Sequence, residues 1–169
     1  SPKVAGTQAL DAATADEALD FFCCFSSSAA VLGDSGAGDY AGANAYQLAY
    51  AAYRNARVEA GERSGRTVSV AWPLWREGGM GAQEGEAIEQ YLRSSAQRYL
   101  EREEGLAAWE RALASGAAQR LVLAGDRARV EGFLARLGAT RQETGAEAPP
   151  SLPRAASGEA DTWLPVLVR

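Results

Sequence analysis

Histidine is absent from this sequence of 169 residues, and several other features are scarce. Without histidine the chain cannot build a Ser-His-Asp triad or a Cys-His pair, and most zinc sites are excluded as well. The 17 basic residues are outnumbered by 22 acidic ones, for a net charge of −5. The chain therefore lacks the basic field that nucleic-acid binding requires.

Long apolar runs and separated cysteines are missing too. The longest apolar stretch, residues 21–25, is too short to span a membrane. Cys23 and Cys24 are neighbours in the chain and cannot bridge each other without strain. Their apolar setting predicts reduced thiols in the core of a cytoplasmic protein. The chain begins Ser-Pro-Lys without Met or signal peptide, which is consistent with an excised stretch of a longer protein.

Lysine occurs once, as Lys3, against 16 arginines. Genomic base composition often shifts lysine to arginine, and chance then explains the count. Alternatively, Lys3 is kept because arginine cannot replace a lysine that acts as a compact point charge. The count by itself leaves both explanations open.

The order of the predicted elements indicates an α/β protein with a doubly wound parallel sheet. A near-continuous apolar run at residues 19–25 is typical of a strand covered on both faces, and residues 67–72 and 119–124 are further strand candidates. Sheets of this class usually have about six strands, so we expect part of the sheet to lie outside this chain. Predicted helices cover residues 2–15, 39 or 40 to about 61, 84–95, 102–115 and 127–137, the last closed by Gly138, with loops at 26–38 and 73–81.

The composition changes near residue 139, so we divide the chain into a folded portion, residues 1–138, and a linker or tail, residues 139–169. The tail is rich in Glu, Ala, Gly and Ser, with prolines at positions 149, 150, 153 and 165. It ends in an apolar patch at residues 163–168. This patch is either a strand that docks on its own domain or a contact with a following domain or chain.

Three further patterns do not indicate a site, and no metal site is predicted. Residues 36–42 are glycine-rich but fail the G-x-G-x-x-G spacing of a dinucleotide-binding turn. Residues 33–37 resemble a nucleophile elbow, but the closing position is Ala and no histidine base exists. The acidic pair Glu103 and Glu104 is predicted to lie on a solvated helix face.

Hydroxyl groups follow the first predicted strand, at the carboxyl end where open α/β sheets place their chemistry. Tyr40 begins a helix 13 residues after Ser27, and Asn44 lies one turn further along the same face. A serine and a tyrosine that face one point can hold a carbonyl oxygen between two hydroxyl donors. A nearby ammonium can lower the tyrosine pKa from its ordinary value of about 10, so that the phenol gives up its proton. These residues indicate reduction of a ketone by a hydride donor.

Several blocks of the sequence resemble the ketoreductase domains of modular polyketide synthases, a branch of the short-chain dehydrogenase/reductases. The family signature of Phe-Ser-Ser, a glycine loop and Tyr-Ala-x-x-Asn-Ala stands here at residues 25–27 and 40–45. The match continues in residues 68–75 and 78–80, whose Trp-Pro-Leu-Trp and Gly-Gly-Met forms are most similar to synthases with an acyltransferase acting in trans. The resemblance covers about residues 1–138.

The resemblance gives the single lysine a role. Simple short-chain reductases place a lysine four residues after the tyrosine, where this chain has Asn44. In polyketide ketoreductases the lysine comes about 24 residues before the serine, and counting back from Ser27 reaches Lys3. The implied catalytic residues are Tyr40 as proton donor, Ser27 as hydrogen-bond donor to the carbonyl, Lys3 to lower the tyrosine pKa and touch the cofactor ribose, and Asn44 to support Lys3 or a proton-relaying water.

The same resemblance implies NADPH as the cofactor and the β-ketone of an acyl chain on an acyl carrier protein as the substrate. Leu32 stands eight residues before Tyr40, where the subtype that makes L-hydroxyl products usually has Trp, and this favours the D-hydroxyl subtype. A loop over residues 72–80 would close over nicotinamide and pantetheine. The implied cofactor contacts are Lys3, Tyr40, Trp72 and Pro73, and the implied substrate contacts are Ser27, Leu32, Trp75, Gly79 and Met80.

The family's first βαβ units, which carry the dinucleotide loop, would precede Ser1. Expected partners are therefore this N-terminal half, the acyl carrier protein and neighbouring synthase domains, but neither nucleic acid nor membrane. The alternative is a catalytically silent or incomplete reductase fold that serves as a scaffold in a synthase module. The intact tetrad favours the enzyme, whereas the missing cofactor half favours the scaffold if the chain exists alone.

Overall fold

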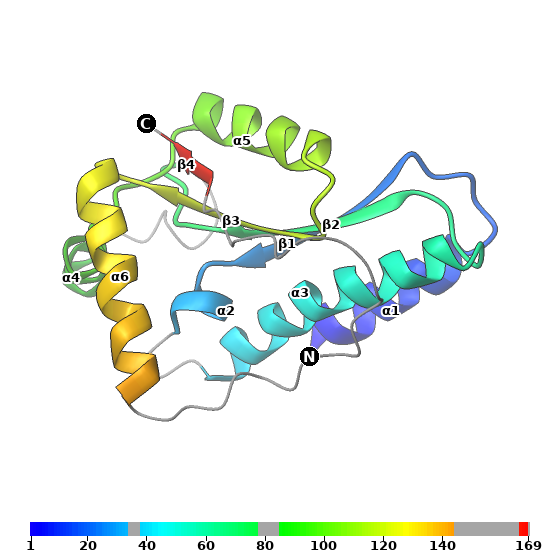
Figure 1. Cartoon of the computed structure of the whole chain (residues 1–169), viewed down its shortest axis with the longest axis horizontal. Helices are drawn as coiled ribbons and strands as arrows, with labels where there is room; N and C mark the ends of the chain where they lie inside the picture. Colours follow the sequence, from blue (N-terminus) through cyan, green and yellow to red (C-terminus); the bar gives the residue numbers. More distant parts are fainter. Residues whose placement is uncertain (34–37, 78–84, 144–165, 169) are drawn as a thin grey trace.

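The computed structural model describes residues 1–33, 38–77, 85–143 and 166–168. Within them four parallel strands form one sheet in the order β1-β2-β3-β4, with helices over both faces (Figure 1). This confirms the predicted doubly wound α/β class. The strands are β1 (Phe21–Ser27), β2 (Arg66–Trp72), β3 (Gln119–Ala124) and β4 (Val166–Val168). The helices are α1 (Pro2–Ala13), α2 (Ala29–Leu32), α3 (Gly38–Glu59), α4 (Glu86–Ser94), α5 (Arg102–Ala114) and α6 (Arg127–Glu143).

Side chains of the central strands alternate between two helical layers. On one face α1 and α3 lie side by side (Figure 1). Arg54 of α3 contacts Phe22 of β1 and Thr67 of β2. On the other face α5 packs against β2 and β3. The buried cluster there contains Val68, Val70, Trp72, Leu100, Ala108, Ala112, Val122 and Ala124.

β1 lies at the edge of the sheet and pairs, in the described part of the chain, with β2 alone. Phe22 and Cys24 are buried under α3, whereas Phe21 and Phe25 remain 46% and 52% exposed. The expectation of a strand covered on both faces is therefore wrong for one face of β1. The run is apolar on both sides, but no described element covers the outer phenylalanines fully. Such an edge with exposed rings pairs readily with a further strand.

Several predicted boundaries differ from the structure. β1 extends to Ser27, and α2 lies inside the predicted loop, because the Ser27 hydroxyl accepts the Ala29 N–H at 3.2 Å and starts a turn. α6 continues through Gly138 to Glu143, so the predicted tail begins inside a helix. One interior glycine costs a helix only about 1 kcal/mol, which the flanking turns can offset. Residues 166–168 pair in parallel with β3, as in the first of the two alternatives for the apolar patch.

The acidic pair at the start of α5 does not lie wholly on a solvated face. Glu103 is exposed, but Glu104 forms a capping box with Glu101. Glu104 also accepts two hydrogen bonds from the Arg98 guanidinium, at 2.8 and 2.6 Å. The prediction is therefore wrong for Glu104, since a residue six positions earlier folds back onto it.

Candidate active site

The face of α3 that meets β1 carries Tyr40, Asn44 and Gln47, which are spaced four and three residues apart. Tyr40 is half-buried, and Asn44 is fully buried. Asn44 Nδ2 donates to the carbonyl oxygen of Tyr40 at 2.8 Å, and Ser26 Oγ donates to the carbonyl oxygen of Asn44 at 2.9 Å. These bonds fix the start of α3 against the carboxyl end of β1.

Within the described ranges, the oxygen of the Asn44 side-chain amide lacks a hydrogen-bond donor. Its Oδ1 atom is buried and makes no hydrogen bond to any residue that the structure describes. A buried acceptor without a donor is costly, and folded proteins keep one chiefly where a water, a ligand or a function supplies the partner. Asn44 Oδ1 is therefore a candidate site for such a donor.

Lys3, in the first turn of α1, reaches both β1 and α3. Its Nζ donates to the carbonyl oxygen of Phe25 at 2.6 Å and to Gln47 Oε1 at 3.1 Å. Burial lowers the pKa of Lys3 by disfavouring the charged ammonium, and the charge interaction with Cys24 opposes this shift only in part. The ammonium thus lies in a site that is partly shielded from water.

The cysteines beside Lys3 are free thiols, as predicted. Burial raises the pKa of Cys24 to about 11, and Cys23 adds to the rise, while Lys3 and Arg54 oppose it. Burial likewise raises the pKa of Cys23. Both side chains are therefore neutral at physiological pH and act as small apolar groups.

Ser27 ends β1 opposite Trp72, the last residue of β2. Ser27 Oγ accepts the Ala29 N–H, and its own proton is given to no residue in the described ranges. The hydroxyl can therefore donate to a bound molecule at the carboxyl end of the sheet. Trp72 is buried, and its indole Nε1 has no partner among those residues.

Of the remaining predicted contacts, Pro73 and Trp75 follow β2 directly in the chain. Pro73 is buried. Trp75 packs against the α5 side of the core, and its ring centre lies 5.1 Å from that of Trp72 with the two planes tilted by 56°. A side chain at Gly105 would overlap the Trp75 ring. The structure thus gives Trp75 a packing role at the base of the loop. Leu32 ends α2 and is half-buried, and Gly79 and Met80 lie outside the described residues.

The four predicted catalytic residues are arranged around the ends of β1, α1 and α3. Gln47 links Lys3 to the helix that carries Tyr40 and Asn44, and Ser27 lies at the end of the adjacent strand. Among the described residues, no side chain of this tetrad bonds directly to another tetrad side chain. Gln47 was missed by the sequence analysis, although its spacing from Asn44 places it on the same helix face.

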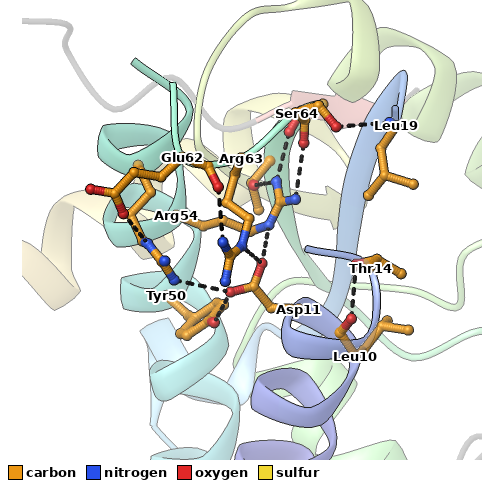
Figure 2. Close-up of polar contacts among 12 residues, drawn as sticks. Leu10, Asp11, Thr14, Leu19, Tyr50, Arg54, Glu62, Arg63 and Ser64 are labelled. Atoms are coloured by element: carbon orange, nitrogen blue, oxygen red, sulfur yellow. Dashed lines mark hydrogen bonds and ion pairs between the residues drawn. The ribbon is translucent and has the colours of Figure 1, made fainter. Parts of the chain in front are cut away.

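A buried ion network that the sequence analysis also missed joins α1 to α3 (Figure 2). Arg54 Nε donates to Asp11 Oδ1 at 2.7 Å, and Tyr50 donates its hydroxyl proton to Asp11 Oδ2 at 2.7 Å. Arg63 Nε also donates to Asp11 Oδ1, at 3.0 Å. Burial alone would raise the pKa of Asp11, but the hydrogen bonds from these three residues outweigh it and hold that pKa below its ordinary value.

Arg54 also ties this network to the sheet. Its guanidinium donates to the carbonyl oxygens of Ser64 and Gly65, at 2.9 and 2.7 Å, and to Thr67 Oγ1 at 3.0 Å (Figure 2). The same group lies 4.5 Å from the centre of the Phe22 ring. Because α1 carries both Asp11 and Lys3, the network holds in place the helix that carries the Lys3 ammonium.

Metal-binding clusters and membrane-spanning helices are absent from the described ranges. No group of three His, Cys, Asp or Glu side chains there could hold a metal ion. None of the helices in those ranges has the length and apolarity to cross a membrane.

Comparison with known proteins agrees with the family resemblance. The family model of the KR domain matches residues 1–77. The polyketide synthase PksM of Bacillus subtilis is 47% identical over 148 residues, which is 88% of this chain and 3% of PksM. The polyketide synthase ThaG of Burkholderia thailandensis is 46% identical over 134 residues, which is 79% of this chain and 2% of ThaG.

The fold agrees as well. A solved ketoreductase domain from the bacillaene assembly line is 36% identical, with a TM-score of 0.74 over 79% of this chain and 32% of that one. The chain therefore spans about a third of that domain and a few per cent of the synthases. By sequence and by fold, it belongs to the ketoreductase domains of polyketide synthases and covers part of such a domain.

Proposed function

We propose that this chain supplies the catalytic residues for NADPH-dependent reduction of a β-keto group, on an acyl chain carried by an acyl carrier protein, during polyketide biosynthesis. The observation that carries the proposal is the shielded ammonium of Lys3. It is held against α3, the helix that also presents Tyr40 and Asn44. A surface lysine with no function has no need of a half-buried site that lowers its pKa.

The residues present fit one end of the cofactor. Asn44 Oδ1 and Trp72 Nε1 are buried polar atoms without partners among the described residues, one an acceptor and one a donor. Trp72 lies at the carboxyl end of β2, where open parallel sheets bind their ligands. Lys3, Tyr40, Trp72 and Pro73 are the residues that we propose hold the nicotinamide and its ribose. This sequence contains no G-x-G-x-x-G turn for the phosphates, so we propose that another part of the domain supplies it.

When bound, NADPH supplies a hydride to the carbonyl carbon of the substrate. In the proposed mechanism Tyr40 donates its phenolic proton to the carbonyl oxygen, which would otherwise become an alkoxide. Ser27 donates its free hydroxyl proton in a hydrogen bond to that same oxygen. The hydride and the proton together convert the ketone to an alcohol and leave Tyr40 as a tyrosinate.

Lys3 stabilises this tyrosinate by its positive charge. An ammonium has three N–H donors, and Phe25 and Gln47 take two of them. No described residue accepts the third, which can therefore meet the ribose or the tyrosinate. Asn44 Oδ1 accepts a hydrogen bond from Lys3 or from a water that returns a proton to Tyr40.

The substrate and the partners follow from the family. Leu32 in place of a tryptophan favours a D-hydroxyl product, and Gly79 and Met80 are proposed contacts for the acyl chain or its pantetheine. We modify the role of Trp75: packed against Gly105, it fixes the base of the loop over residues 72–80. The proposed partners are the cofactor-binding half of the domain, the acyl carrier protein and neighbouring domains of a cytoplasmic synthase, one with an acyltransferase acting in trans.

The test is Tyr40→Phe in a protein that joins this chain to a cofactor-binding half. Loss of the only proposed general acid should lower reduction of a β-ketoacyl thioester at least about 10²-fold. NADPH binding, followed by its fluorescence, should hardly change. Tyr53→Phe is the matched control, since Tyr53 lies exposed on the same helix. Turnover of Tyr40→Phe equal to this control would reject the proton donor and favour the scaffold.

A further inference from the structure

We propose that Gln47 is a positioning residue for Lys3: its amide oxygen holds the ammonium toward α3, and the Thr7 hydroxyl fixes which way the amide faces. This inference rests on the proposed function, since it explains how the proposed catalytic lysine is oriented. Neither Gln47 nor Thr7 belongs to the motif that first identified the site.

The three residues form a closed ring of hydrogen bonds between α1 and α3. Lys3 Nζ donates to Gln47 Oε1 at 3.1 Å, and Gln47 Nε2 donates to Thr7 Oγ1 at 3.2 Å. Thr7 Oγ1 in turn donates to the carbonyl oxygen of Lys3 at 2.6 Å. The ring begins and ends on the lysine, so the direction of the ammonium is coupled to the backbone that carries it.

The order of donors in this ring allows only one orientation of the Gln47 amide. A hydroxyl has a single proton, and Thr7 gives its proton to the carbonyl of its own helix. Thr7 Oγ1 can therefore only accept from Gln47, which turns the amide nitrogen toward Thr7 and the amide oxygen toward Lys3. The reversed amide would place N–H donors against the ammonium. Gln47 and Thr7 are 8% and 6% exposed, so water competes poorly for these bonds.

A neutral acceptor suits this position. Gln47 lies two helical turns after Tyr40, so the direction of the ammonium relative to α3 decides how strongly it acts on the phenol. The amide directs the ammonium and leaves its charge intact. A glutamate here would pair with the ammonium and cancel part of its field at the proposed tyrosinate.

The experiment compares variants in the complete ketoreductase domain, measuring kcat, KM and the pH dependence of kcat. Gln47→Leu should lower kcat about tenfold or more, the usual effect of losing one hydrogen bond to a charged group. Gln47→Glu places a carboxylate beside the ammonium and should move the pH limb of kcat by about one unit. Thr7→Val should lower kcat in the same direction as Gln47→Leu, and Thr7→Ser should restore it. Gln8→Leu and Gln8→Glu are the controls, because Gln8 is an exposed glutamine of α1 and should behave as wild type.

Each outcome decides the proposal. Unchanged kcat and pH profiles in the Gln47 variants, beside an impaired Lys3→Met, would overturn it and leave the proposed function standing. A merely structural Gln47 would lower stability without moving the pH limb, and that result overturns it too. If Lys3→Met retains full activity, the lysine's role in the proposed function fails instead. If Gln47→Leu does not fold, the Thr7 variants decide. Equal kcat values and pH profiles for Thr7→Val and Thr7→Ser would then refute the role proposed for the hydrogen-bond ring.

Discussion

The ion network between α1 and α3 predicts that Arg54→Met will be strongly destabilising. Arg54 is fully buried, and its partner Asp11 is 3% exposed. Methionine keeps much of the volume and the contact with Phe22, but it removes the charge and every donor. The substitution therefore isolates the polar contribution of the side chain from its packing.

The size of the stability loss depends on the buried partners that lose Arg54. Removing one partner of a buried ion pair costs about 3–5 kcal/mol. Asp11 retains Tyr50 and Arg63, which lowers this cost, whereas the carbonyl oxygens of Ser64 and Gly65 lose their donor. An unmet buried acceptor costs roughly 1–3 kcal/mol, so the two corrections oppose each other. We expect a loss of about 3 kcal/mol or more.

The assay is urea unfolding of the complete domain, followed by tryptophan fluorescence and by circular dichroism. The control is Arg93→Met, which breaks an ion pair to Glu89 whose side chains are 66% and 67% exposed. That pair lies four residues apart on α4 and should contribute about 0.5 kcal/mol or less. If Arg54→Met lowers the free energy of unfolding by less than about 1 kcal/mol, or by no more than the control, the conclusion that this network holds α1 against α3 would be refuted.

Four further outcomes are expected. Lys3→Arg should lower activity while the fold persists, because a broad fork replaces a compact ammonium; a pH–rate profile that overlays wild type would contradict this. Gly105→Ala should cost about 1–3 kcal/mol by pressing on Trp75. Gly132→Ala, on α6, would meet only the end of the Arg136 side chain at 3.6 Å and should be neutral or stabilising in the same thermal melt. The folded pKa of Asp11 is depressed, so its stabilisation is present above its unfolded pKa of about 3.9 and is lost as the pH falls below that value. An acid titration should therefore show a shallower loss of stability in Asp11→Asn, and an unchanged slope would speak against the linkage. Expressed by itself, the chain should self-associate through the exposed edge of β1 and bind no NADPH; a monodisperse fragment with saturable NADPH binding would show that it is self-sufficient.

Local patterns were enough to predict most of the fold. The apolar run at β1, the β-branched run at β2 and the glycines that end the helices are short-range signals, and the structure has an element at each. Boundaries were less certain, because they depend on single contacts. The hydroxyl of Ser27 starts α2 inside a predicted loop, and α6 runs through Gly138 because one glycine costs a helix little.

The candidate site also has residues that the sequence indicates and contacts that only the structure shows. Lys3, Ser27, Tyr40 and Asn44 could be named from the sequence, because a chain with one lysine and a family-like spacing leaves few alternatives. Their roles remain a proposal, which the variants above test. The sequence gives no sign, however, that Lys3 is held by Gln47, which is 44 residues away.

What the sequence determined by itself is the three longer strands, the longer helices, their order and the residue types that carry the proposed chemistry. Each of these depends on neighbours within a few residues along the chain. Only the tertiary structure decided that α1 and α3 lie side by side, that Asp11 and Arg54 meet 43 residues apart, and that a charged pair in alanine-rich helices is buried. A charged side chain in such a helix predicts exposure when taken alone, and it can be buried only because packing brings a partner of opposite charge.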